Sequence, residues 1–245
     1  MLDSVDDIRC RPVTSFVRRS PRMNDSQRAA WQRLGGRFLV NGLARDTMQT
    51  QFVPQPPIDQ AHLFGRTAPL LVEIGAGSGE NLAAVATARP NWNIIGFEVY
   101  DKVMGSAMSR LERAGAVNVR LVHGDAVTGL EHLLTCQSIA ELHTFFPDPW
   151  HKARHAKRRL VNHDFVILAA SRLGAGGLWR LATDWPDYAV HTRGVFASAD
   201  AQPLFDDVTA AEALTYKRPE TKFEKRAKAA GRAVTEFVYR RTETP

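Results

Sequence analysis

The sequence predicts a doubly wound α/β fold, in which helices cover both faces of a mostly parallel sheet. From Pro69 onwards, short apolar runs that suit buried strands alternate with amphipathic stretches that suit helices. A glycine-rich loop follows the first apolar run, as it does in Rossmann-like sheets. The last two strand-like runs have no helix of ordinary strength between them. We therefore expect a C-terminal antiparallel strand pair at the end of the sheet.

Each predicted element is bounded by local signals. Pro90 ends one helix, because proline disfavours helical geometry in the residue before it, and Gly115 closes the next. The predicted helices are Asp25–Phe38, Glu80–Ala88, Asp101–Ala114, Thr128–Leu134 and Asp164–Leu173. The predicted strands are Leu70–Ile74, Asn93–Glu98, Val117–Val122, Ile139–Phe146, Leu178–Thr183, Leu204–Val208 and Ala233–Arg241. A long polar loop, Thr215–Gly231, is expected between the last two strands, and such loops are usually functional or disordered.

Length and charge predict one domain with a basic extension. The chain has 245 residues, which suits a single α/β domain at 69–245 preceded by an N-terminal basic arm with one helix at 1–68. The net charge is +6, with nine Lys/Arg against five Asp/Glu in residues 1–50, five against none in 151–159, and nine against four in 216–245. The rest of the chain is therefore acidic. Three basic segments around an acidic body favour a nucleic acid partner over three unrelated solvated surfaces.

Other classes of protein are disfavoured. The sequence has no apolar stretch near the roughly 18 residues of a membrane span, and its acidic first residues differ from a secretory signal. Cys10 and Cys136 have neither metal-ligand spacing nor the number that a disulfide framework needs. We expect a cytoplasmic protein without a membrane or metal partner. The sequence sets no oligomeric state.

The glycine loop is the first candidate site. Gly75, Gly77 and Gly79 follow the first strand in the order G-x-G-x-G. Glycines allow a tight turn and close approach of a ligand, and the next helix begins with unpaired N–H groups. The spacing is shorter than the G-x-G-x-x-G of dinucleotide binders, which favours a ligand with a carboxylate over one with a pyrophosphate.

Three acidic residues lie at successive strand ends, where ligands of open α/β sheets bind. Glu73 could face a sulfonium or amino group, Glu98 could accept hydrogen bonds from ribose hydroxyls, and Asp125 could accept one from an adenine amine. The alternative for each is an exposed turn or a helix cap, and for Asp125 this alternative is equally favoured. Together with the loop, the acids predict S-adenosylmethionine as the cofactor. A nicotinamide dehydrogenase is the rival interpretation.

The fourth strand runs into a stiff turn with a basic segment behind it. Pro147 and Pro149 flank Asp148 and precede Trp150, so one carboxylate and one large ring stand at the cofactor edge. A rigid turn in which Asp148 caps its own backbone is the alternative. The basic segment could hold phosphates beside a reacting base.

These segments resemble the bacterial tRNA (guanine-N(7)-)-methyltransferase family, from about residue 14 to 241. The run FFPDPWHKARHAKRRL at 145–160 carries most of the likeness. FVRR at 16–19 with Arg22 and Met23 is similar to the family's N-terminal arm, ATDW at 182–185 to its fifth-strand end, and RPETKFEKR at 218–226 to its C-terminal loop. Ala153 and Ala156 stand where the family commonly has basic or histidine residues, which implies a weaker phosphate grip there.

The resemblance implies a role for each matching position. It implies that the cofactor is held by Glu73, Glu98, Asp125 and Asp148, and that Asp148 is catalytic. The positions implied to contact substrate are Lys152, Asp184, Thr221, Lys222, Phe223 and Glu224. The positions implied to contact RNA are Arg154, His155, Ala156, Lys157, Arg158 and Arg159. The implied reaction is methylation of a guanine, in the variable loop of tRNA, at nitrogen 7.

Structural alternatives accompany two of these residues. Asp184 could cap the helix that follows it, and Glu224 could pair with Lys222 or Lys228. Two rival functions are a base methyltransferase acting on an exocyclic amine, and a tRNA-binding module with a vestigial cofactor site. The intact glycines and acids of the cofactor site argue against the second.

Overall fold

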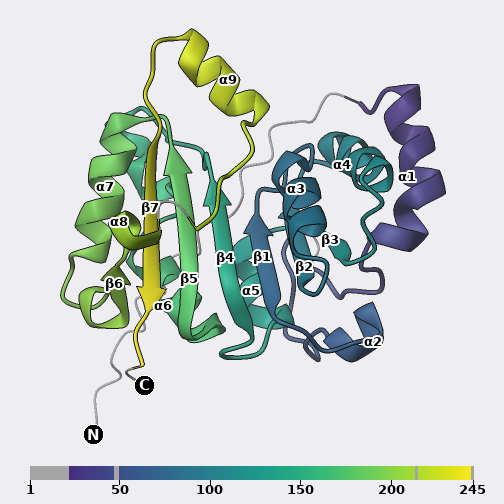
Figure 1. Ribbon diagram of the computed structural model, residues 1–245, viewed down its shortest axis with the longest axis horizontal. Helices are drawn as coiled ribbons and strands as arrows, with labels where there is room; N and C mark the ends of the chain where they lie inside the picture. Colours follow the sequence, from purple (N-terminus) through teal and green to yellow (C-terminus); the bar gives the residue numbers. More distant parts are fainter. Residues whose placement is uncertain (1–21, 47–49, 213–214, 244–245) are drawn as a thin grey trace, which may run out of the picture.

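A seven-stranded mixed sheet forms the centre of the computed structural model, which describes residues 22–46, 50–212 and 215–243. The strands are β1 (Leu70–Ile74), β2 (Asn93–Glu98), β3 (Val119–His123), β4 (Ile139–Phe145), β5 (Leu173–Thr183), β6 (Phe205–Asp207) and β7 (Thr235–Arg241). Their order across the sheet is β3-β2-β1-β4-β5-β7-β6 (Figure 1). The first five strands pair in parallel, whereas β7 runs antiparallel to both β5 and β6. The predicted fold class is confirmed, including the C-terminal antiparallel pair.

Helices cover both faces of this sheet and enclose two apolar cores. One core packs α1 (Asp25–Phe38), α3 (Glu80–Ala88) and α4 (Asp101–Arg113) against the β1–β3 half. The other packs α5 (Ala126–Leu133), α6 (His163–Arg172) and α7 (Pro186–Phe196) against the opposite face. The strands of the parallel part are buried on both sides, which explains why β1 and β2 are almost continuously apolar in sequence.

The described residues before the sheet, 22–46 and 50–69, pack against the sheet and its helices. A reciprocal capping box of Asn24 and Gln27 begins α1, which lies against α4. Leu39 then pairs with Leu121 of β3, so the chain leaving α1 adds to the edge of the sheet. A second helix, α2 (Gln60–Phe64), was not predicted; its five residues are too few to show a helical period. The arm residues 1–21 lie outside the described residues.

The C-terminal part differs most from the prediction. The segment expected to be a polar loop contains α9 (Lys222–Ala229), preceded by the short α8 (Thr209–Glu212). Five of the eight residues of α9 are charged, and Thr221 before it, Glu224 and Ala227 are buried. Strand β5 also begins five residues before the predicted Leu178, because the glycines at 174–177 weaken the strand signal without preventing pairing. Figure 1 shows the chain from α8 crossing in front of β5 and β4 to reach α9 above the sheet.

The described ranges hold neither a helix suited to span a membrane nor a cluster of potential metal ligands. No helix in residues 22–46, 50–212 and 215–243 combines the length and the apolar character that a membrane crossing requires. Within the same ranges, no three His, Cys, Asp or Glu residues gather as metal ligands would.

Candidate cofactor and substrate site

A cleft of about 290 Å³ opens at the carboxyl ends of β1, β2 and β4. Parallel strands end at one edge of a sheet, so residues from distant parts of the sequence meet there. The residues that line this cleft include Glu73, Gly77, Glu98, Asp148, Arg158 and Thr221. The volume is close to the lower end of the range for small-molecule sites, about 300 Å³.

The glycine loop needs its glycines for two different reasons. Gly75, Gly77 and Gly79 all have positive φ, at 73°, 54° and 75°, where L side chains are strained. At Gly79 a Cβ would also stand 3.1 Å from the Cβ of Ala107, so this glycine lets α3 approach α4 closely. At Gly75 and Gly77 the space is open toward the cleft, so a ligand can approach the backbone there.

Glu98 ends β2 with its carboxylate already partly occupied. One oxygen accepts from the backbone N–H of Gly77 at 2.8 Å, and the other accepts from the N–H groups of Val99 and Tyr100 at 2.8 and 2.9 Å. A carboxylate has about four acceptor positions, so roughly one is left for a ligand. Burial, together with the nearby charge of Asp148, raises the pKa of Glu98 despite these hydrogen bonds. The remaining acceptor position suits one ribose hydroxyl, whereas the sequence predicted that Glu98 accepts hydrogen bonds from more than one.

Glu73 ends β1 deep in the cleft, with only 4% of its surface exposed. Burial raises the pKa of its carboxyl group to about 8, and the amide of Asn81, which donates to it at 3.0 Å, opposes that rise. The charges of Glu80 and Glu98 push the pKa in the same direction as burial. A site with several crowded carboxylates favours a cationic ligand, because a cation offsets both desolvation and mutual repulsion.

Asp125 lies differently from the other two acids. It is 1% exposed and caps α5: its carboxylate accepts from the Thr128 N–H at 2.9 Å and from the Thr128 hydroxyl at 3.2 Å. Its neighbours Gly124 and Ala126 line the cleft. The helix cap that the sequence left open is therefore present, and Asp125 shapes the cleft wall through the backbone beside it.

The turn after β4 holds Asp148 at the mouth of the cleft. Phe146 and Trp150, on either side of the Pro147–Pro149 segment, have φ values of 52° and 48°, which are rare for large side chains. Such strain persists only where the surroundings impose it. Asp148 itself is exposed, and its charge acts on Glu98 across the cleft. The turn thus presents an accessible carboxylate beside the cofactor acids.

The basic run divides into two parts. Lys152, Arg154 and Lys157 are exposed around a short 3-10 helix, Ala153–Arg158. Arg158 is half-buried, lines the cleft, and stacks its guanidinium 5.1 Å from the Trp150 ring centroid. Arg159 is only 4% exposed, and its guanidinium bonds the Pro149 carbonyl and the Asp187 carboxylate. Arg159 therefore stabilises the turn from inside, in contrast to the RNA contact that the resemblance implied.

His155 and Ala156 complete the run and are half-buried. The His155 ring stands edge-on to the Trp150 ring, with centroids 5.8 Å apart. Both residues therefore support the surface from which Arg154 and Lys157 project.

The C-terminal residues reach the same edge from β5 and α9. Thr221 caps α9 and lines the cleft. Glu224 forms an ion pair with Lys228, one of the two lysines that the sequence offered as partners, and another with Arg218 at 2.7 Å. Asp184 pairs with Arg232 at 2.8 Å and does not cap α7, which begins after Trp185. The side chains of Lys222 and Phe223 lie outside the described residues.

Sequence reasoning missed a buried polar cluster behind the cleft. Asn81 lies between Glu73 and His143, and Tyr216 reaches it from the C-terminal segment. Arg218 packs its guanidinium over the rings of Phe145 and Phe146 at 5.3 and 5.0 Å. The sequence feature that could have indicated this cluster is the presence of Asn81 and His143 within elements that are largely buried.

Two solved methyltransferase structures share this fold. A 16S rRNA methyltransferase, KamB, superposes with a TM-score of 0.52 at 12% identity, over 84% of this chain and 99% of that chain. An antibiotic-related methyltransferase gives a TM-score of 0.51 at 16% identity, over 73% of this chain and 90% of that chain. These likenesses concern the fold alone. The model of a family described as "Putative methyltransferase" matches residues 67–237, which makes this protein a methyltransferase of the Rossmann-like class.

Full-length relatives narrow the assignment. A tRNA (guanine-N(7)-)-methyltransferase from Cutibacterium acnes is 47% identical over 95% of this chain and 84% of the relative. One from Methylococcus capsulatus is 41% identical over 95% of both chains, and one from Nitrosomonas eutropha is 37% identical over 93% and 96%. The chain belongs to the tRNA (guanine-N(7)-)-methyltransferase family.

Proposed function

We propose that this protein transfers the methyl group of S-adenosylmethionine to nitrogen 7 of a guanine in tRNA, the variable-loop guanine that the family resemblance implies. One observation carries the proposal. The exposed carboxylate of Asp148 stands on a rigid turn, with the carboxylates of Glu73 and Glu98 on one side and the exposed basic residues from Lys152 to Lys157 on the other. A cationic methyl donor and a polyanionic acceptor each have a complementary surface there.

The cleft fits S-adenosylmethionine, which supplies an electrophilic methyl group on a positively charged sulfur when bound. The open backbone at Gly75 and Gly77 would accept its amino-acid end, and Glu98 a ribose hydroxyl. Glu73, whose pKa burial raises to about 8, would face positive charge and become fully ionised. The adenine would lie near Gly124 and Ala126, at the wall that Asp125 stabilises.

Guanine nitrogen 7 has a lone pair and no proton to lose. Attack on the methyl group therefore depends on alignment and electrostatics rather than on a general base. Positive charge moves from sulfur into the guanine ring during transfer, and Asp148 would stabilise it there. The carboxylate could also accept N–H groups of the base and so help to select guanine. Lys152, Arg154 and Lys157 would hold phosphates beside it.

Two measurements test the proposal in order. Titration calorimetry with S-adenosylhomocysteine and with NAD should give binding of the first alone; the opposite result would remove the cofactor assignment. Incubation of a tRNA transcript with methyl-labelled S-adenosylmethionine, followed by nuclease digestion, should give labelled 7-methylguanosine. Label in an N2-methylated nucleoside would favour the exocyclic-amine alternative, and cofactor binding without transfer to any tRNA would favour a binding module.

A further inference from the structure

A chain of hydrogen bonds connects the deepest cofactor carboxylate to the C-terminal segment. Asn81 on α3 is 2% exposed, and its amide nitrogen lies 3.0 Å from a Glu73 carboxylate oxygen and 3.0 Å from Nδ1 of His143 on β4. Its amide oxygen accepts a hydrogen bond from the hydroxyl of Tyr216. The three partners come from β1, β4 and the chain after α8, so no local sequence pattern joins them.

The donors and acceptors fix the direction of every bond in this chain. The Nε2 atom of His143 lies 2.8 Å from the carboxylate of Glu141, which can only accept when ionised, so Nε2 carries the proton. Nδ1 must then accept, and the amide nitrogen of Asn81 supplies its two hydrogens to His143 and Glu73. A flipped amide would place its oxygen against two acceptors. Tyr216 donates to the amide oxygen and so stabilises the orientation in which the amide nitrogen of Asn81 donates to Glu73.

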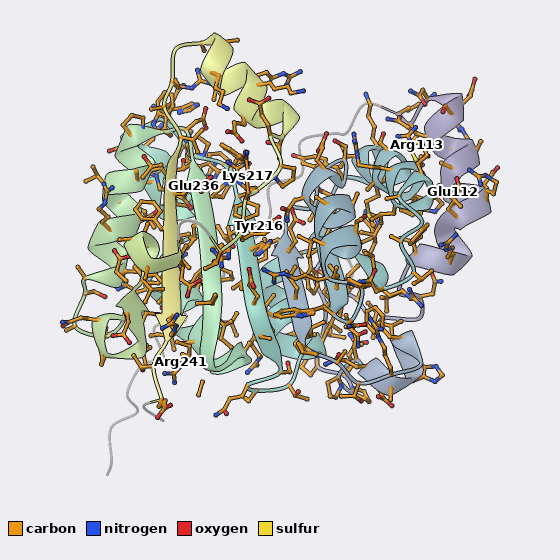
Figure 2. The ribbon with its side chains drawn as sticks, viewed as in Figure 1. Glu112, Arg113, Tyr216, Lys217, Glu236 and Arg241 are labelled. Atoms are coloured by element: carbon orange, nitrogen blue, oxygen red, sulfur yellow. The ribbon has the colours of Figure 1, made fainter. Side chains whose placement is uncertain are left out.

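The Tyr216 side chain is itself held in place on the face of the sheet. Its ring stands 5.3 Å from the His143 ring, and the guanidinium groups of Arg89 and Arg180 stack on it at 5.5 and 5.6 Å. Figure 2 labels Tyr216 on the chain that leads to α9, over the middle of the sheet. Replacing tyrosine by phenylalanine would keep these ring contacts and delete only the hydroxyl.

We propose that Tyr216 is a positioning residue for the cofactor, acting through Asn81 to keep a hydrogen bond donor on the Glu73 carboxylate. The inference rests on the proposed function, because it takes Glu73 as the group that faces the cofactor's positive charge. Without the hydroxyl, the buried amide oxygen of Asn81 loses its hydrogen bond donor, and the amide is held less firmly against Glu73. The hydrogen bond to Glu73 is then weaker in a buried place, and the ionised form of Glu73 becomes less favourable.

Other charged groups also face Glu73 and set the background for a pH experiment. Glu80 from α3 and Glu98 from β2 oppose its ionisation, whereas Arg218 from the C-terminal segment favours it. Asp148 lines the same cleft, and neutral His143 stands behind Asn81, with burial lowering the pKa of its ring. None of these groups is altered by Tyr216→Phe, so their effects cancel when the variant is compared with the unmodified protein at each pH.

The test is calorimetric titration of S-adenosylmethionine, which carries the positive charge that Glu73 would face, into the unmodified protein, Tyr216→Phe and a control, Tyr239→Phe, at pH 7 and pH 9. Tyr239 is a buried tyrosine that stacks on Phe196 on the opposite face of the sheet. If the lost donor raises the pKa of Glu73 by about one unit, affinity should fall about tenfold at pH 7 and about twofold at pH 9. The control should bind like the unmodified protein at both values.

The outcomes separate the inference from the function beneath it. Failure of the unmodified protein to bind would defeat the proposed function. Normal binding by Tyr216→Phe, or an equal loss at both pH values, would overturn the positioning role, since a structural defect has no reason to follow the ionisation of Glu73. A second variant, Asn81→Leu, should show the same pH-dependent loss. Combining it with Tyr216→Phe should add little, because both changes remove one shared contact.

Discussion

The Nε atom of Arg159 donates a hydrogen bond to the carbonyl oxygen of Pro149, 3.0 Å away. The last member of the basic run thus reaches back across ten residues to the turn that carries Asp148. Its guanidinium also pairs with Asp187 at the start of α7 and lies 5.3 Å from the Tyr188 ring. One cationic residue therefore braces the turn that carries Asp148 against the helix behind it, while Lys152, Arg154 and Lys157 of the same run are exposed.

Replacing Arg159 should damage the turn rather than the grip on RNA. Arg159→Ala removes a buried hydrogen bond and an ion pair, so we expect a stability loss of about 1–3 kcal/mol by thermal unfolding. The methyl-transfer rate at saturating tRNA should fall, while the salt dependence of tRNA binding stays unchanged. A reduced salt slope would instead mean that Arg159 contacts phosphate.

The exposed part of the basic run should show the opposite behaviour. Arg154→Ala combined with Lys157→Ala should weaken tRNA binding and lower the slope of log affinity against log salt by about 1.5, for two phosphate contacts. Affinity for S-adenosylhomocysteine should hardly change, since neither residue lines the cleft. Arg28→Ala with Arg113→Ala, on α1 and α4, makes the same charge change elsewhere. If this control pair loses as much tRNA affinity, the effect comes from net charge alone.

Asp148→Asn tests what the carboxylate contributes. The amide keeps the shape and one acceptor but loses the charge, so single-turnover methylation should slow by about a hundredfold, or roughly 3 kcal/mol. With saturating cofactor, the methylation rate of neither protein should fall as the pH is lowered from 9 to 5. A general base would make the unmodified protein, and not the variant, lose rate toward acidic pH. An equal rate in both proteins would leave Asp148 as a turn residue.

Glu73→Gln should stabilise the protein without cofactor in alkaline solution. Burial raises the pKa of Glu73 to about 8 from an ordinary value near 4.5, so the folded state holds a proton that the unfolded state has released between these limits. The resulting stabilisation is complete below about pH 4.5 and is lost as pH rises through 8. The variant should therefore unfold at a higher temperature than the unmodified protein at pH 8.5, with the difference shrinking toward pH 5. A pH-independent difference would contradict the burial of a titrating carboxyl group here.

The cofactor edge could be predicted from sequence because parallel strands impose it. Once Leu70–Ile74 and Asn93–Glu98 are assigned as neighbouring parallel strands, Glu73 and Glu98 must come out at one edge. The sequence also showed that the Asp125 carboxylate could either cap the helix that follows it or face a ligand.

The other features of the site depend on tertiary contacts, which produce no periodic pattern in the sequence. Tyr216 and Asn81 are separated by 135 positions, and five of the eight residues of α9 are charged, so its sequence shows little apolar pattern. The inward direction of Arg159 was equally hidden, because its neighbours in the sequence are also basic and a charge run is normally solvated. In each case a tertiary partner decided the role of a polar residue.

The position of β7 between β5 and β6 imposes an order of assembly during synthesis. Strand β6 is made first, yet it joins the sheet through β7, whose residues 235–241 leave the ribosome about thirty positions later. The parallel core from β1 to β5 can form before that point, whereas β6, α8 and the segment that follows α8 must wait. A nascent chain would thus pair the strands that carry Glu73 and Glu98 and the strand that leads to Asp148 before Thr221 takes its place in the lining of the cleft. Loss of β7 would leave the cleft's strands paired and the segment that carries Tyr216 without an anchor at its far end.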